Sequence, residues 1–396
     1  MYITRPRSQY RNHRSVVPQH HSEAPSLGSL VVTDEESEEL DTSCFGLVKS
    51  NSVNSLPFPQ DRILKIVHTL QFKEGSNVSK VWFIPVVDQP LSSNRYYIIK
   101  ASGEHKGKAY TCSRGEEGGA CCLNSFSTQK MDLKPRRFNY QDVYQQFEIH
   151  RNHNGGFFAQ SVAYDGVPPK LLRTKGWQVF VSCSFRLNLQ DAQGMISSQL
   201  LYLPRLDFPI HAKRSDPIVI GRWYCPVVFM KEETKVSEQM QRSLFYEVTL
   251  KQWWEEIYSC ENESRSKANI VNVNVNVKRR MVLINGMEAV KGNGKDDDGN
   301  VWFKVKECYG KKASVGLCCV MFEKLRSLQE RRGWFDRKEI EVKVEGTNEI
   351  KIEGKNVWRR FVCYVLVESF VFRRMDGTLL INFNFKNTDR IECRCE

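Results

Sequence analysis

The sequence has no apolar run near the roughly 20 residues that a membrane-spanning helix requires, although 41% of its residues are hydrophobic. It also has no secretory leader pattern at its start. The 13 cysteines include no C-x-x-C pair, the spacing that places two thiolates on one zinc ion. We therefore expect a cytoplasmic protein with buried free thiols and no transmembrane segment, and leave a nuclear or organellar location open.

Catalytic signatures are missing as well. There is no G-x-S-x-G elbow, no protein-kinase motif set and no G-x-G-x-x-G dinucleotide fingerprint. No histidine follows His211. We therefore predict no catalytic residue and no cofactor, and expect a non-catalytic binding or interaction protein. An enzyme whose active site is assembled from distant residues stays an alternative, because active sites form in space rather than in sequence.

The loop GEHKGK, residues 103–108, resembles a phosphate-binding loop only superficially. A P-loop needs G-x-x-x-x-G-K, then Ser or Thr, then a helix. Here Gly103 and Gly107 are one residue too close, and Ala109 stands where the hydroxyl residue belongs. The pattern favours a bend between two strands. His105 and Lys108 are kept as candidates for a surface contact.

Two groups of residues have the composition of a metal site without its spacing. His105, Cys112, Cys121 and Cys122 match no common zinc module, so free thiols in a loop are favoured. The acidic run 296–298 lacks the alternate ligands and closing Glu of an EF-hand, so a solvated turn is favoured. No metal site is predicted.

The formal charge of +12 and the pI near 9.0 would suit a polyanionic partner. The basic residues are dispersed, however, in short clusters: KPRR at 134–137, KRR at 278–280, and pairs at 331–332, 359–360 and 373–374. Such clusters are typical of solvated faces, so a nucleic-acid partner is not expected. A basic surface that binds nucleic acid or anionic lipid remains an alternative.

Strand patterns dominate the chain. Short runs rich in β-branched and aromatic residues, bounded by turn formers, occur at 62–72, 80–87, 95–101 and 108–112. Residues 269–280 alternate valine with asparagine, which predicts a strand with one apolar and one polar face. The tryptophans lie mostly inside such patterns, which favours core packing over a stacking platform.

Hairpins and helices are predicted from local signals. Asn285-Gly286 and Asp376-Gly377 each separate two apolar runs, as in β-hairpins. A capping box, Thr249 to Gln252, predicts a short helix over 250–260. An apolar stripe predicts a longer helix over 315–332, with Ser314 as its cap and Gly333 as its stop; the stripe comprises Leu317, Met321, Leu325 and Leu328.

The length favours two or three packed units. We expect a β-rich α+β protein with antiparallel sheets and a few helices. The predicted divisions are a polar, partly disordered N-terminal arm at 1–43, a β-rich unit at 44–137, a second unit at 138–265 and a third at 266–396.

Two internal echoes suggest a duplicated β-rich unit. The pattern P-x-h-D-x-P-h-x-x-x-R, where h is aliphatic, occurs at 85–95 and again at 204–214. Its charged residues are Asp88 with Arg95 and Asp207 with Arg214, which we expect to brace a turn or contact a partner. A second echo matches 223–229 with 361–367 and 243–252 with 378–387.

Several long segments resemble the plant family catalogued as domain of unknown function 1262. The segments are MYITRP at 1–6, CFGLVKSNSVNSLPFPQ at 44–60, FIPVVDQPLSSNRYYII at 83–99, DVYQQFEI at 142–149, GRWYCPVVFMKE at 221–232, SLFYEVTLKQWWEEI at 243–257 and CYVLVESFVFRRMDGTLL at 363–380. The resemblance implies a soluble plant protein without assigned activity, cofactor or catalytic residue. Some relatives carry an automatic label naming an insecticidal crystal toxin domain, which implies a β-rich binding fold. A role in plant stress or defence, with a protein or glycan partner, is the resulting expectation.

Overall fold

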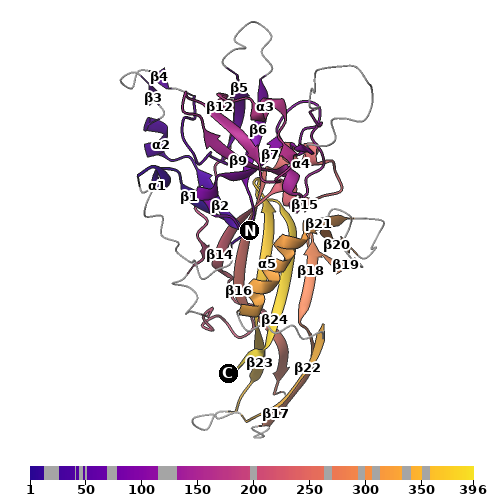
Figure 1. Cartoon of the computed structure of the whole chain (residues 1–396). Coiled ribbons are helices and arrows are strands. Elements are labelled where there is room, and N and C mark those ends of the chain that lie inside the picture. The colour runs from indigo at the N-terminus through magenta and orange to yellow at the C-terminus, as the bar shows by residue number, and fades with distance from the viewer. Residues whose placement is uncertain are drawn as a thin grey trace. The chain divides into compact units, whose positions relative to one another are not determined.

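A computed structural model describes residues 1–12, 26–40, 42–43, 48–49, 51–68, 78–114, 132–196, 203–262, 270–292, 299–305, 313–331, 340–349 and 357–396. The chain forms two compact units (Figure 1). Unit 1 comprises Met1–Ser22, Ser26–Ala192 and Tyr224–Leu244, and unit 2 comprises Glu23–Pro25, Gln193–Trp223 and Phe245–Glu396. Strands predominate and most of them pair antiparallel, so the predicted fold class is confirmed. The division at residues 43, 137 and 265 stays a prediction.

Unit 1 is built on a six-stranded antiparallel sheet. In spatial order its strands are β10 (Phe157–Ser161), β9 (Gln146–Arg151), β7 (Arg95–Lys100), β6 (Ser79–Pro85), β5 (Arg62–Val67) and β12 (Gln178–Arg186). Shorter elements of the unit are α1 (Ser8–Asn12), α2 (Glu35–Leu40), α3 (Lys170–Arg173), α4 (Val236–Arg242), β3 (Thr42–Ser43), β4 (Val48–Lys49), β8 (Ser113–Arg114), β11 (Gly166–Val167) and β15 (Met230–Lys231). The predicted strands near 62–72, 80–87 and 95–101 are confirmed as β5, β6 and β7.

The core of unit 1 lies against one face of this sheet and is rich in aromatic side chains. Phe58 is fully buried at its centre, among Phe83, Tyr96, Phe157 and Trp177. The ring centroids of Phe58 and Phe83 are 4.7 Å apart, and those of Phe58 and Phe157 are 4.9 Å apart in an edge-on arrangement. Core packing, predicted for the tryptophans, is confirmed for the fully buried Trp82, Trp177 and Trp223.

The first residues of the chain are part of the folded core. β1 (Tyr2–Pro6) pairs in parallel with β2 (Gly28–Val32), and Met1 and Tyr2 are fully buried. The hydroxyl of Tyr2 donates to the Pro85 carbonyl at 2.8 Å. Within the polar, partly disordered arm predicted for 1–43, residues 2–6 and 28–32 thus form paired strands, because their apolar side chains, such as Tyr2 and Leu30, are buried. Residues 13–25 lie outside the described part.

The loop at 103–108 is a tight turn, as predicted. The Gly107 amide donates to the Lys100 carbonyl at 2.8 Å, and Gly103 and Gly107 both have positive φ, at +71° and +85°. Glycine adopts such angles without steric cost. The strand predicted at 108–112 is reduced to two isolated bridges, which pair Ala109 with Ile99 and with Arg136.

Asp61 in unit 1 gives a pH-dependent prediction. Its carboxylate accepts from the Thr33 hydroxyl at 3.0 Å and lies 3.3 Å from Arg62 Nε. Burial, with 2% of the residue exposed, raises its pKa above the ordinary 3.8, although Arg62 and Thr33 act in the opposite direction. The folded protein then binds the proton more tightly than the unfolded chain. The stability linked to this proton is fully present below about pH 3.8 and is lost as pH rises through the folded pKa.

We therefore expect the unfolding free energy of the wild type, relative to Asp61→Asn, to fall as pH rises from about 3.8 through the folded-state pKa of Asp61. Paired urea titrations of the two proteins across this range measure the difference. A difference that rises with pH would show that Arg62 and Thr33 outweigh burial.

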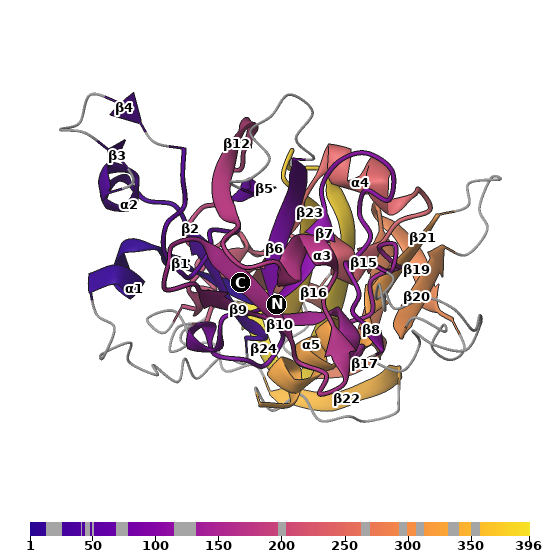
Figure 2. The same ribbon diagram turned by 45° about the horizontal axis from the view of Figure 1, so that its top comes forward.

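Unit 2 is organised around long antiparallel strands. The order within the unit is β21 (Ser314–Cys318), β20 (Asn300–Val305), β19 (Met287–Lys291), β18 (Arg280–Ile284), β24 (Leu379–Cys395), β23 (Arg360–Arg374), β16 (Phe245–Glu261) and β14 (Ile218–Pro226), with β13 (Gly194–Met195) paired to β14. β14 ends in unit 1, where Tyr224 pairs with Tyr2. Figure 2 shows β19, β20 and β21 grouped together.

The helix predicted at 250–260 is wrong, because residues 245–261 form the strand β16. Side chains at alternate positions of this strand are buried, namely Val248, Leu250, Gln252 and Trp254. The strand pairs with β23 along almost its whole length, with one register shift after Glu256. That long-range pairing and the strand preference of tryptophan, isoleucine and tyrosine override the local capping signal.

The second predicted helix is confirmed in part. Helix α5 spans Cys319–Arg331, and its buried stripe includes Met321, Leu325 and Leu328 as expected. Residues 314–318, which we assigned to the helix, form β21 instead, and Ser314 is therefore no helix cap. These residues form a strand because Val315 and Leu317 alternate with small residues and pair with β20. Gly333 lies outside the described residues.

The alternating valine and asparagine segment is confirmed as β17 (Ile270–Lys278), which pairs with β22 (Glu341–Glu349). Val271, Val273 and Val277 are buried, and the three asparagines between them are exposed. The hairpin predicted at Asn285-Gly286 is confirmed between β18 and β19, with both residues at positive φ. The hairpin at Asp376-Gly377 joins β23 to β24.

The two copies of the echoed pattern have different local structures. Residues 85–95 connect β6 to β7 in unit 1. Residues 204–214, in unit 2, contain no strand. The segment is held against β16 by Trp254 Nε1, which donates to the Pro204 carbonyl at 2.7 Å, and against β23 by the Tyr364 hydroxyl, which donates to the Ile210 carbonyl at 2.9 Å. Duplication of a β-rich unit stays a prediction.

A candidate ligand pocket between helix α5 and the sheet

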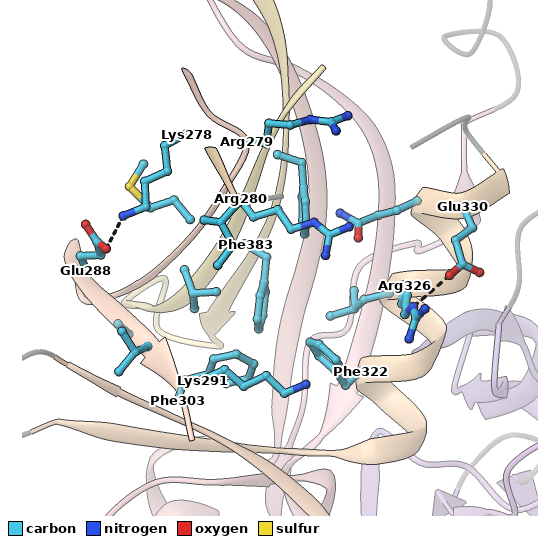
Figure 3. Close-up of a pocket in the computed structure, with 18 residues that line it drawn as sticks. Lys278, Arg279, Arg280, Glu288, Lys291, Phe303, Phe322, Arg326, Glu330 and Phe383 are labelled. Atoms are coloured by element: carbon cyan, nitrogen blue, oxygen red, sulfur yellow. Dashed lines mark hydrogen bonds and ion pairs between the residues drawn. The ribbon is translucent and has the colours of Figure 1, made fainter. Parts of the chain in front are cut away.

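Unit 2 contains a cavity of about 610 Å³ between α5 and the strands β18, β19, β20 and β24. Figure 3 shows the side chains around it, with the helix on one side and the strands on the other. Ligand pockets commonly measure about 300 to 1,000 Å³, so the cavity can hold a small molecule.

Strand register explains why the lining side chains share one face of the sheet. Opposite residues of an antiparallel pair project to the same face. Arg280 of β18 lies opposite Phe385 of β24, and Val282 lies opposite both Phe383 of β24 and Ala289 of β19. Two positions further along β19, Lys291 lies opposite Phe303 of β20. The pairings therefore gather residues from four strands beneath the helix.

The floor of the cavity is aromatic. Phe303 and Phe383 meet edge to face with ring centroids 5.2 Å apart, and Phe322 of α5 completes the group at 5.9 Å from Phe303. Phe303 is 1% exposed and Phe383 is 2% exposed. Ala289 and Leu325, both buried, extend this apolar surface. An apolar ligand group placed here would gain dispersion contacts and leave water.

The rim of the cavity is cationic. Five basic side chains line it, namely Lys278, Arg279, Arg280, Lys291 and Arg326, against two carboxylates. Glu288 forms an ion pair with Lys278, and Glu330 accepts from Arg326 Nε at 2.9 Å. Both carboxylates are thus engaged by basic residues, and the lining keeps a positive balance. Figure 3 shows Arg280 extending from β18 toward the helix.

Two lining residues stand out by their contacts. Lys291 Nζ lies over the Phe322 ring, 5.0 Å from its centroid, and it has no carboxylate partner among the described residues. Gln329 of α5 is 8% exposed, and its Nε2 has no hydrogen-bond partner in the described part of the chain. A buried donor without a partner costs free energy, about 1–3 kcal/mol. A ligand acceptor could satisfy this donor while Lys291 supplies an opposite charge.

The lining offers binding groups and few reactive ones. The described lining residues include no serine, threonine, cysteine, histidine, tyrosine or aspartate, the usual nucleophiles and bases. No cluster of three metal-ligating side chains occurs among the described residues of the whole chain. The arrangement is suited to holding a molecule that combines an apolar body with an anionic group.

None of the six candidate contact residues named from the sequence, Asp88, Arg95, His105, Lys108, Asp207 and Arg214, lines this cavity. Asp88 lies in the turn after β6, where it is exposed, has φ of +56° and donates its amide to the Leu27 carbonyl at 2.8 Å. Arg95, at the start of β7, lies opposite Glu148 of β9 and donates from Nε to its carboxylate at 3.1 Å. Arg95 therefore links two strands of the sheet.

His105 and Lys108 are brought together in the turn after β7. Lys108 Nζ lies 3.4 Å from His105 Nδ1, and Glu104 Oε1 lies 3.3 Å from His105 Nε2. Cys112, from the rejected zinc grouping, is buried, and burial raises its pKa to about 12. Cys121 and Cys122, like the acidic run 296–298, lie outside the described residues.

Asp207 and Arg214 are both exposed at the surface of unit 2. Asp207 lies 3.9 Å from Arg205, with most of each side chain in solvent. Arg214 bridges through its backbone to Glu255 of β16. A role for these two residues, or for Asp88, Arg95, His105 and Lys108, in a partner contact stays a prediction.

Comparison with protein-family models matches one part of the chain, mostly within unit 1. Residues 23–123 match the family model described as Protein of unknown function (DUF1262). The DUF1262 segment ends well before the cavity, whose lining begins at Lys278. No curated protein sequence matches the chain. A solved structure titled "Crystal structure of Cry35Ab1" is similar with a TM-score of 0.46 and 11% identity, covering 85% of this chain and 90% of that chain.

One part of the cavity lining is conspicuous in the sequence. The basic triplet at 278–280 is predicted to lie on a solvated face, yet Arg279 is 6% exposed and all three residues line the cavity. The signal available in the sequence for this part of the cavity was a basic triplet between an alternating strand and a hairpin. It could not indicate a pocket, because Phe383 and Phe322 reach it from distant parts of the chain.

No helix among the described residues has both the length and the apolar character needed to cross a membrane.

Proposed function

We propose that this protein is a non-catalytic binding protein whose α5 cavity takes a small amphipathic anion. The proposal rests on one observation, an aromatic floor beneath a cationic rim that also holds the unpartnered donor of Gln329. An aliphatic or aromatic acid has matching chemistry, because its body suits the phenylalanines and its carboxylate suits Lys291 and Arg280. The role in plant stress or defence, the cytoplasmic location and a protein or glycan partner stay part of the expectation from sequence.

The lining supports binding over catalysis. Glu288 and Glu330 are the carboxylates of the described lining, and each is engaged in an ion pair with a neighbouring base. The cavity lining therefore offers every group that a binding role requires.

Lys291 provides a sharp test because a matched lysine lies on the neighbouring strand. Lys304 of β20 is exposed, and strand alternation directs it to the face opposite Phe303, away from the cavity. We expect Lys291→Ala to weaken octanoate binding about tenfold, the equivalent of one ion-pair contact of about 1.4 kcal/mol. Lys304→Ala should leave the affinity unchanged.

Displacement of the fluorescent sulfonate 8-anilinonaphthalene-1-sulfonate by octanoate measures these affinities in the full chain. Neutral 1-octanol should compete less well than octanoate, and the difference should shrink at high salt because salt screens the exposed rim charges. Equal competition by octanoate and octanol, or equal losses in the two lysine variants, would contradict the proposal.

A further inference from the structure

Two thiols of unit 2 face each other across adjacent strands. Cys363 of β23 lies directly opposite Cys393 of β24, and their Sγ atoms are 3.1 Å apart. Both are free thiols. Nothing in the α5 cavity uses them, since neither residue lines it.

The backbone hydrogen bonds define the type of pair. Arg360 and Glu396 exchange both of their backbone hydrogen bonds, at 3.3 and 3.0 Å. Hydrogen-bonded and non-hydrogen-bonded pairs alternate along an antiparallel ladder, so Cys363 and Cys393, three pairs further on, form a non-hydrogen-bonded pair. Cα atoms in such pairs are about 4.5 Å apart, within the range that a disulfide spans. The strands need not separate or shift register for the two sulfurs to bond.

The two sulfurs differ in their surroundings. Cys363 is 1% exposed and belongs to an apolar cluster with Phe361, Val271 and Val273, whereas Cys393 is exposed to solvent. An oxidant in solution therefore reaches Cys393 first, and Cys363 lies behind it as a protected second thiol. Reactive and resolving thiols of redox-sensitive proteins have this arrangement.

We propose that Cys363 and Cys393 are a peroxide-reactive pair that closes reversibly into a disulfide between β23 and β24. In the first step the Cys393 thiolate attacks one oxygen of a peroxide such as hydrogen peroxide, the O–O bond breaks, and sulfenic acid and hydroxide form. In the second step Cys363 sulfur attacks the Cys393 sulfenic sulfur and displaces its oxygen, which leaves as water with the thiol proton. The two thiols lose two electrons, and the peroxide is reduced to two waters after protonation of the hydroxide.

The electrostatics of the pair agree with these roles. The hydrogen bond from Cys363 lowers the pKa of Cys393, and the same contact together with burial raises the pKa of Cys363. A lowered pKa increases the thiolate fraction of the exposed sulfur, and the thiolate is the nucleophile toward peroxide.

Two other cysteines lie nearby and are the alternative partners that an experiment has to distinguish. Cys260 of β16 and Cys395 of β24 both lie opposite Phe361, so neither faces Cys363 directly. Trypsin separates all four cysteines, because Cys363, Cys393, Cys260 and Cys395 fall in the peptides 361–373, 391–394, 252–265 and 395–396. A disulfide between any two of them therefore yields a distinct pair of linked peptides.

The experiment treats the reduced full chain with hydrogen peroxide, alkylates the remaining thiols and maps linked peptides by mass spectrometry. We expect peptide 361–373 joined to 391–394, with a loss of two hydrogens, and recovery of both free peptides after dithiothreitol. Cys393→Ser, at an exposed position, should abolish the linkage. Cys395→Ser, also exposed and two residues away, should retain it.

Three results would overturn the proposal. They are a treated wild type whose Cys363 and Cys393 stay alkylated as separate thiols, a linkage of Cys363 to Cys260 instead, and persistence of a Cys363 linkage in the Cys393→Ser protein. Because the wild-type map involves no substitution, a misfolded variant cannot obscure the first two outcomes.

Discussion

Replacement of Phe58 by alanine is expected to lower the unfolding free energy of unit 1 by about 4 kcal/mol. The side chain is fully buried, and its ring lies within 6.3 Å of four other aromatic rings. Its removal leaves a cavity among large groups that are fixed by the surrounding sheet, so the site cannot collapse to fill the space. Loss of the edge-on contact with Phe157 adds to the cost.

Urea unfolding followed by tryptophan fluorescence measures the change, with Trp177 as a reporter beside the site. Tyr164→Ala is the matched control, because that aromatic residue is fully exposed and its replacement should change stability by less than about 0.5 kcal/mol. Phe58→Leu should fall between the two. Equal stabilities of the Phe58→Ala and Tyr164→Ala proteins would show that the aromatic cluster does not organise this unit.

Replacement of Gly156 by alanine is the second change with a large expected effect. Gly156 has φ of +70°, and a Cβ at this position would lie 2.7 Å from the backbone of Gly176 and from the Trp177 carbonyl. These atoms cannot move easily, because the Phe157 amide donates to that carbonyl at 2.8 Å and the Gly176 amide donates to the Phe157 carbonyl at 2.9 Å. We expect a loss of about 3 kcal/mol from backbone strain and the forced separation of these segments.

The neighbouring Gly155 separates the two contributions. It also has positive φ, at +91°, but a Cβ there would meet no atom within 4 Å. Gly155→Ala should therefore cost only the strain, about 1 kcal/mol. Thermal and urea unfolding of both variants gives the comparison, and similar losses in the two proteins would mean that the contact with Gly176 is relieved without cost.

How much of this fold can be predicted from sequence depends on how local the evidence is. The alternation at 270–278 and the turn at Asn285-Gly286 were predictable, because both signals lie within a few residues. The strand β16 was not, because its capping box is local whereas its pairing with β23 joins residues 99 to 128 positions apart. The burial of Tyr2 was not predictable either, because it contacts Pro85 and pairs with Tyr224, both distant in sequence.

The candidate site was hidden by the same limitation. Arg280, Phe303, Phe322 and Phe383 are ordinary residues in ordinary patterns, and only the strand register and the position of α5 bring them around one cavity. The pairing of Cys363 with Cys393 was equally unpredictable, because it depends on the register between β23 and β24. Conversely, the repeated motif at 85–95 and 204–214 was conspicuous in the sequence, yet its two copies have different local structures.

The interleaving of the two units has a consequence for how the chain folds during synthesis. Unit 1 takes its last segment, Tyr224–Leu244, from beyond the first strands of unit 2, and this segment includes α4 and the fully buried Phe229. The ribosome must therefore release residues through Leu244 before the core of unit 1 can be completed. Until then, residues 193–223 emerge with no finished neighbour to pack against. Domains usually fold as they leave the ribosome. Here unit 1 can be completed only after a part of unit 2 has been synthesised.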